Sequence, residues 1–176
     1  TLREKYTSFP KVIDYLDQMQ KNILENIDIF LPEKNVPQAG MPFMGRGPQQ
    51  PAPQFTEYKV NVIIDNSLTQ GAPVIFETNP TYNNLFGSIE KEVRFGAMFT
   101  DFTMIQAGSL AKANGGYIVL EILDMFKYPF IWDALKKAIE NEELRIEDIY
   151  QQYGISGPVG IRPEPIELDV KVILAG

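Results

Sequence analysis

A stretch rich in proline and glycine, residues 32–54, most constrains how this chain can fold. It holds six prolines, three glycines and several glutamines. Proline cannot continue a helix interior or a central strand, because it lacks the backbone N–H donor that both structures use. The stretch therefore predicts a linker or loop. Its apolar residues Met41, Phe43 and Met44 could touch a substrate or a neighbour, but we favour an uncommitted loop.

This stretch divides the sequence into three parts. We predict a helical segment over residues 1–31, a Pro/Gly-rich linker or loop over 32–56, and an α/β core over 57–176. A hydrophobic content of 44% is sufficient for such a core. The chain starts without Met and ends on an apolar run that resembles a strand cut as it finishes. We therefore expect a fragment of a longer protein.

The composition excludes several kinds of site within this chain. It contains 16 Lys and Arg against 23 Asp and Glu, a net charge of −7, with no His and no Cys. A Ser-His-Asp triad, a cysteine nucleophile, a disulfide and a zinc finger are thereby excluded. The acidic balance argues against nucleic acid as a partner, and no apolar run approaches the roughly 20 residues of a membrane span. The lack of cysteine agrees with a reducing compartment, so we expect a cytoplasmic protein.

Residues 8–31 have the periodicity of an amphipathic helix. Ser8 can cap it, and Pro10 suits its first turn. Apolar residues then recur at steps of three and four, which places them on one face. We predict a packing helix that runs to about Leu31 rather than a leucine zipper, because the stripe covers only about three heptads. The stripe consists of Val12, Leu16, Met19, Ile23, Ile27 and Phe30.

From residue 58 onward, the pattern alternates between strands and helices. Strands are predicted at 58–65, 72–77, 117–120 and 170–174, and helices at 107–113 and from Pro129. Asn114-Gly115-Gly116 should end the first of these helices. One face of the second should consist of its apolar residues Ile131, Trp132, Leu135, Ala138 and Ile139. The runs at 117–120 and 170–174 are continuously apolar, which is typical of strands buried on both faces. The alternation therefore predicts a largely parallel sheet covered on both sides. Residues 144–150 and 158–162 alternate around glycines and predict a hairpin with a long tip.

Three short motifs have simpler explanations than the sites they resemble. The glycines at 40–47 resemble a phosphate loop, but Arg46 and Gly47 replace the required Lys and Ser or Thr. Ser109 and Lys112 match a Ser-x-x-Lys motif whose companion motifs are missing, so we expect a capping Ser beside a surface Lys. Asn79-Pro80 resembles a peptide-sorting motif, but we favour a turn.

The segment 116–121 is more informative. Four apolar residues, 117–120, are followed by Glu121, as in the Walker B strand that presents a carboxylate to Mg²⁺ in nucleotide hydrolases. Asp124 follows shortly after. Residues 62–65 fit nearly the same template, so this motif needs support from its context.

That context resembles the ATPase module of Lon-related proteases. The similarity covers about residues 58–176, and Tyr6–Phe30 resembles the helix that precedes the module. The order and spacing of many pieces make it far more specific than any single motif. The matching pieces are Tyr58–Asn66, Gly71–Val74, Asn79–Glu90, Thr100–Phe102, Ala107–Leu110, Ala113–Tyr117, Pro163–Ile166 and Leu168–Val172.

The resemblance implies a fold and a set of partners. The expected fold is a partial AAA+ P-loop-type parallel sheet flanked by helices, with an N-terminal helix and a β-hairpin insertion at 144–162. The parent protein would be a homo-oligomeric ring, a hexamer, that uses ATP and Mg²⁺ and feeds unfolded or damaged proteins to a Ser-Lys peptidase domain further along the chain. The phosphate loop, sensor 1 and the peptidase dyad would lie outside these 176 residues, so the fragment alone would be inactive and need no cofactor.

The resemblance also assigns candidate residues. Glu121 takes the Walker B aspartate position, a direct or water-mediated contact to Mg²⁺, and Ile122 stands where an active ATPase has its catalytic glutamate. Isoleucine cannot polarise water, so hydrolysis through this site is in doubt. Asp124 points away from Glu121 if the strand continues, and the geometry is open if a helix begins there. No catalytic residue and no further metal ligand is expected in this chain.

An aromatic loop before the Walker B strand faces the axial pore in related rings. Phe99, Phe102 and Met104 fall in that region and are candidates for gripping unfolded polypeptide, unless they pack into the core. Two other functions remain open. A degenerate AAA+ scaffold that gates substrate entry without hydrolysing ATP is favoured by Ile122, and a freestanding peptide-binding module would use residues 79–82 or the Pro-rich segment.

Overall fold

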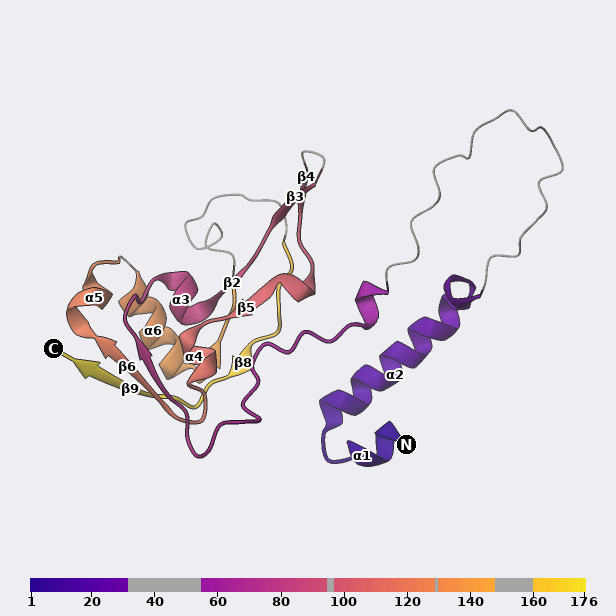
Figure 1. Cartoon of the computed structure of the whole chain (residues 1–176), viewed down its shortest axis with the longest axis horizontal. Helices are drawn as coiled ribbons and strands as arrows, with labels where there is room; N and C mark the ends of the chain where they lie inside the picture. The colour runs from indigo at the N-terminus through magenta and orange to yellow at the C-terminus, as the bar shows by residue number, and fades with distance from the viewer. Residues whose placement is uncertain (32–54, 95–96, 129, 148–159) are drawn as a thin grey trace. The chain divides into compact units, whose positions relative to one another are not determined.

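The computed structural model describes residues 1–31, 55–94, 97–128, 130–147 and 160–176 (Figure 1). They fall into two compact units, Thr1–Lys59 and Val60–Gly176, which are described separately. The Pro/Gly-rich stretch, with Met41, Phe43 and Met44, lies outside the described residues, as does Pro129. None of the helices in the described ranges is long and apolar enough to cross a membrane.

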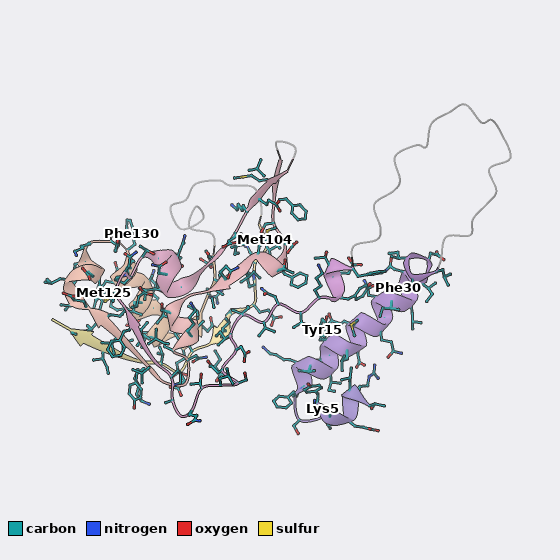
Figure 2. All side chains as sticks on the ribbon, in the orientation of Figure 1. Lys5, Tyr15, Phe30, Met104, Met125 and Phe130 are labelled. Atoms are coloured by element: carbon teal, nitrogen blue, oxygen red, sulfur yellow. The ribbon has the colours of Figure 1, made fainter. Side chains whose placement is uncertain are left out.

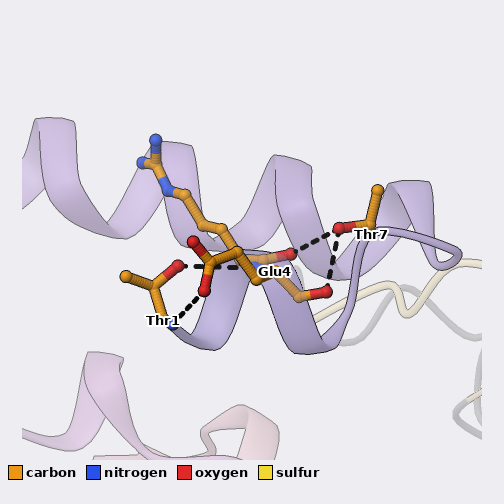
Figure 3. A network of polar contacts seen from close by, with 4 residues as sticks. Thr1, Glu4 and Thr7 are labelled. Carbon is orange, nitrogen blue, oxygen red and sulfur yellow. Dashed lines mark hydrogen bonds and ion pairs between the residues drawn. The ribbon is translucent and has the colours of Figure 1, made fainter.

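The first unit consists of short and long helical pieces. They are α1 (Leu2–Lys5), α2 (Pro10–Glu25) and the 3₁₀ turns η1 (Ile27–Phe30) and η2 (Thr56–Tyr58). Thr1 caps α1, because its hydroxyl accepts a hydrogen bond from the Glu4 N–H at 3.4 Å. At the other end, the Thr7 hydroxyl donates to the carbonyl oxygens of Arg3 and Glu4 at 2.9 and 3.0 Å (Figure 3).

The predicted helix is confirmed in its core but differs at both ends. Phe9 rather than Ser8 occupies the N-cap position, without a side-chain hydrogen bond, and Pro10 is the first helical residue. The α-helix ends at Glu25 and continues only as the 3₁₀ turn η1. The apolar stripe is half-buried at best, so no residue of α2 is buried in the described chain. The ring of Phe30 stacks on Phe55 with centroids 4.9 Å apart.

A parallel three-stranded sheet is the centre of the second unit. Its strands are β1 (Val74–Glu77), β6 (Tyr117–Glu121) and β9 (Lys171–Ala175), in the order β1-β6-β9. In the register, Glu77 pairs with Leu120, and Leu120 pairs with Leu174. The predicted second strand is therefore confirmed at the edge of the sheet, where its N-terminal proline, Pro73, is tolerated.

The helices of this unit are α3 (Tyr82–Phe86), α4 (Ser109–Lys112), α5 (Ile122–Phe126) and α6 (Ile131–Glu140). Ile118 and Leu120 of β6 are completely buried in the same cluster as residues from all four helices. In α6, the three- and four-residue spacing of Ile131, Leu135 and Ala138 forms the buried face, as predicted. Trp132 and Ile139, expected on that face, are at its exposed margin.

The opposite face of the sheet is exposed, and the prediction of strands buried on both faces is wrong for the described residues. Successive side chains of a strand point to opposite faces. Val74, Phe76, Tyr117 and Ile173 are exposed. Their continuous apolar sequence matches a strand with two covered faces, but no described element covers this one.

Three small antiparallel pairs complete the second unit. β2 (Gly87–Ile89) pairs with β5 (Ile105–Ala107), and β3 (Glu92–Arg94) pairs with β4 (Ala97–Phe99). The 3₁₀ turn η3 (Phe102–Met104) lies between β4 and β5. β7 (Glu143–Leu144) pairs with β8 (Ile166–Glu167). The strand pair at the base of the predicted 144–162 hairpin is therefore 143–144 with 166–167, beyond the predicted C-terminal end. Residues 148–159 of the predicted hairpin lie outside the described ranges.

The predicted strand at 58–65 is absent. Tyr58 ends the turn η2, and residues 59–62 have no strand partner. Asn61 explains what this segment does instead. Its side-chain amide donates to the carbonyl oxygens of Phe102 and Ile105 at 2.9 and 3.1 Å. Two hydrogen bonds from the Asn61 side chain therefore connect this segment to η3 and β5, in place of the backbone hydrogen bonds of a strand.

Candidate functional site

Two carboxylates lie at the C-terminal ends of neighbouring parallel strands. β1 ends at Glu77 and β6 ends at Glu121. Open α/β sheets bind ligands beyond the carboxyl ends of their strands. Glu121 is exposed and Glu77 is half-buried, so the two residues have different surroundings. This edge is the first candidate site.

Glu77 is already engaged in hydrogen bonds. Its carboxylate accepts one from the buried hydroxyl of Ser109 and another from the Asn79 N–H, at 2.8 Å. Ser109 is the first residue of α4, and Gly108 is the N-cap, so Ser109 does not cap the helix as expected. Lys112 is exposed, as expected. The Ser109 hydroxyl thus serves to hold Glu77 at the end of β1.

The turn at Asn79-Pro80 extends this network. The Tyr128 hydroxyl donates to the side-chain oxygen of Asn79 at 2.8 Å, and the Asn84 side chain donates to the Asn79 carbonyl at 2.8 Å. Pro80 is fully buried, and Thr81 caps α3 by accepting from the Asn84 N–H at 3.2 Å. The motif starts a turn and a helix, which confirms the simpler interpretation.

A helix begins directly after Glu121. Ile122 is the first residue of α5, and Asp124 lies in its first turn. Asp124 forms an ion pair with Lys127 one turn later. This hydrogen bond and charge interaction, with a smaller contribution from the charge of Glu121, raise the pKa of Lys127 above its ordinary value. The carboxylate of Asp124 is therefore paired with Lys127, the C-cap residue of the same helix.

The β3–β4 ribbon is the second candidate site. Val93 and Met98 are directly opposite each other, and their side chains are 67% and 59% exposed. Phe99 is 43% exposed. Phe102 and Met104, in η3, are less exposed and are half-buried (Figure 2 labels Met104). Sequence reasoning missed Val93 and Met98. Their symmetrical placement around Phe95-Gly96, with glycine as a hairpin signal, could have identified them.

Several hydrogen bonds fix the base of this ribbon. The Thr100 hydroxyl donates to the Glu90 carbonyl at 2.8 Å, and the Glu90 N–H donates to the Met104 carbonyl at 2.9 Å. The Thr103 N–H donates to Asp101 at 2.8 Å. Together with the Asn61 contacts, these bonds attach the exposed strands to the buried core through η3 and β5.

A family comparison agrees with this geometry. A model of the AAA domain of LonB-like proteins matches residues 70–176, more than half of the chain. The chain belongs to the LonB-like AAA domain family. Both candidate sites lie within the matched residues. A search of curated proteins found no match.

The match establishes the Lon-related AAA module and its α/β fold with a parallel sheet. It does not extend to residues 58–69 or to Tyr6–Phe30, so their resemblance to the family stays a prediction. Within the described part of this LonB-like AAA domain, no three acidic, His or Cys side chains are grouped to hold a metal. Glu77 is bound by Ser109 and Asn79, and Asp124 by Lys127, which leaves Glu121 as the carboxylate exposed at the sheet edge.

One carboxylate is compatible with nucleotide-bound Mg²⁺. This ion commonly keeps several waters and takes one or two carboxylates together with phosphate oxygens. Glu121 fits such a contact by its exposure and its place at the end of β6. A separate cavity of about 320 Å³ lies between Tyr82, Lys137 and Arg145 and includes none of the predicted site residues.

Proposed function

We propose that this chain handles polypeptide substrate in a Lon-like ATP-dependent protease. In this proposal, the β3–β4 ribbon contacts unfolded or damaged proteins and passes them to a Ser-Lys peptidase domain outside this chain. The observation that supports it most directly is the exposure of Val93, Met98 and Phe99 on a ribbon whose base is fixed to the core. Apolar side chains held in water gain free energy when an unfolded chain covers them, without regard to its sequence.

Replacing ribbon side chains tests this proposal. We expect Met98→Ser combined with Phe99→Ser to weaken binding of a fluorescent unfolded protein by about tenfold, because two exposed apolar contacts are lost. Leu68→Ser is the matched control, since Leu68 is 94% exposed in a loop elsewhere in the unit. Equal binding by the ribbon variant and the control would refute substrate handling by the ribbon.

ATP and Mg²⁺ are the cofactors proposed for the parent protein. Bound Mg²⁺ would supply charge neutralisation for phosphoryl transfer. Glu121 would hold or orient its coordinated water from the end of β6. In this proposal, a further strand from elsewhere in the protein pairs with the outer edge of β9, and a helix covers the exposed face of the sheet, since parallel sheets are normally covered on both faces. We also propose a cytoplasmic homo-oligomeric ring, a hexamer, without membrane or nucleic-acid partners.

A second candidate is a degenerate scaffold that shapes the ring and gates entry without hydrolysing ATP. It is favoured by Ile122, which has no group to activate water, and by the ion pair that occupies Asp124. ATP turnover by the protein that carries this module distinguishes the two. Turnover that Glu121→Gln abolishes, and that the exposed control Glu140→Gln leaves intact, would rule out the scaffold. Binding of ATP without turnover would support it.

A further inference from the structure

The two strands of the β3–β4 ribbon differ in the residues along their outer edges. In the described part of the chain, β3 and β4 form a sheet of only two strands. Exposed strand edges are templates for pairing with another chain, and proteins commonly protect them with charged residues, prolines or bulges. The two strands differ in this protection. β3 has the sequence Glu-Val-Arg, with a charge on either side of Val93, whereas β4 has the uncharged sequence Ala-Met-Phe.

The side chains along β4 also suit an extended apolar partner. Met98 is 59% exposed and lies opposite Val93, so both side chains are on one face of the ribbon. The sequence of residues 90–101 contains charges of both signs, which are Lys91 and Arg94 against Glu90, Glu92 and Asp101. Charge therefore selects no strongly acidic or basic partner. The feature shared by all unfolded polypeptides is the main chain, which pairs with a strand edge irrespective of sequence.

We propose that an extended apolar polypeptide segment binds as a third strand along the outer edge of β4. Main-chain hydrogen bonds hold the segment, and alternate side chains cover Met98 and Val93. This inference rests on the proposed function, because the segment is the substrate that the ribbon handles. It adds the mode of recognition: the substrate must be extended and must have free backbone N–H groups at the pairing positions. Proline-rich segments are poor substrates for this edge.

Backbone methylation of a peptide tests this inference. The probe is a short fluorescent peptide of alternating Val and Thr flanked by one lysine and one glutamate, and its twin carries an N-methyl group on every residue of the repeat. Both present the same side chains, but the twin has no N–H donor on either edge of its backbone. With the 176-residue chain, we expect the twin to bind at least about tenfold more weakly, and amide hydrogens along β4 to exchange more slowly with the unmethylated peptide.

A protein variant provides the matched control. Met98→Lys places a charge on the unprotected strand and should weaken the unmethylated peptide by about tenfold, whereas Leu68→Lys should not. Equal binding of both peptides, or unchanged exchange along β4, overturns strand addition but leaves the proposed function intact. Binding of unfolded protein but of neither peptide also overturns strand addition. If neither the peptides nor unfolded protein bind, the proposed function fails as well.

Discussion

At the scale of single residues, hydrogen bonds decide which polar groups remain open to a ligand. Glu77 and Glu121 end adjacent strands, but Glu77 is bound by Ser109 and Asn79 while Glu121 is exposed. Asp124 is near Glu121 in sequence and is paired with Lys127. The sequence contains three acidic residues in this region, and their partners reduce the candidates for a cation contact to Glu121.

The Asp124–Lys127 pair makes a testable electrostatic prediction. The pKa of Lys127 is higher in the folded protein than its ordinary value of 10.5. The ion pair therefore stabilises the fold fully below pH 10.5, and this stabilisation is lost as the pH rises through the folded-state pKa of Lys127. Asp124→Asn should lower the pKa of Lys127 toward 10.5, as measured by NMR titration of its ε-carbon. Asp133→Asn is the control, because Asp133 pairs with Lys136. An unchanged Lys127 pKa in Asp124→Asn would contradict the ion pair.

At the scale of elements, two glycines allow the backbone segments that precede and follow the β3–β4 ribbon to pack closely together. A Cβ on Gly108 would lie 2.3 Å from the Leu85 carbonyl oxygen, and a Cβ on Gly87 would lie 2.4 Å from the Gln106 carbonyl oxygen. Both contacts are with backbone, which cannot move aside as a flexible side chain can. The close approach of α3, β2 and β5 at this point positions the whole ribbon.

Substitution of these glycines measures that constraint. We expect Gly108→Ala to reduce the free energy of unfolding by more than about 2 kcal/mol, because the backbone must separate. Gly115→Ala is the comparison. Gly115 has φ +77° with open space around it, so the substitution should cost only the left-handed strain of about 1–2 kcal/mol. Urea unfolding measures both values, and an equal or smaller loss for Gly108→Ala would refute the packing argument.

At the scale of the whole molecule, the two units differ in how much they bury. The core cluster, from Leu85 to Leu168, lies entirely within the second unit, and its partly buried neighbours begin at Ile64. The helices of the first unit contain no buried residue. Within the described residues, the buried core is therefore built from the second unit alone.

Truncation tests whether the core is stable without the first unit. A chain of residues 60–176 should unfold in urea with a free energy within about 1 kcal/mol of that of the core in the full chain, because the whole buried cluster lies within these residues and contributions from independent sites add. It should keep the near-ultraviolet circular dichroism of the aromatic residues packed in the core, such as buried Phe86 and partly buried Tyr82 and Tyr128. A loss of cooperative unfolding on removal of residues 1–59 would show that the first unit supports the core.

Much of the second unit could be predicted from sequence. The spacing of Ile131, Leu135 and Ala138 predicted the buried face of α6, and Asn114-Gly115-Gly116 predicted the end of α4. The strand predicted at 58–65 was wrong, because Asn61 bonds to carbonyl oxygens some 40 residues away, an interaction that local periodicity does not contain. Glu121 was identified as a candidate from its motif, but the engagement of Glu77 was not.

The sequence by itself determined the α/β alternation, the apolar strand that ends at Glu121, and the family, since these depend on local order and spacing. Only the tertiary structure decided that Val93 and Met98 lie opposite each other in an exposed ribbon, that Ser109 holds Glu77, and that one face of the sheet is uncovered. These features depend on contacts between distant residues. Periodicity shows which side chains can be buried, but packing alone decides which ones are.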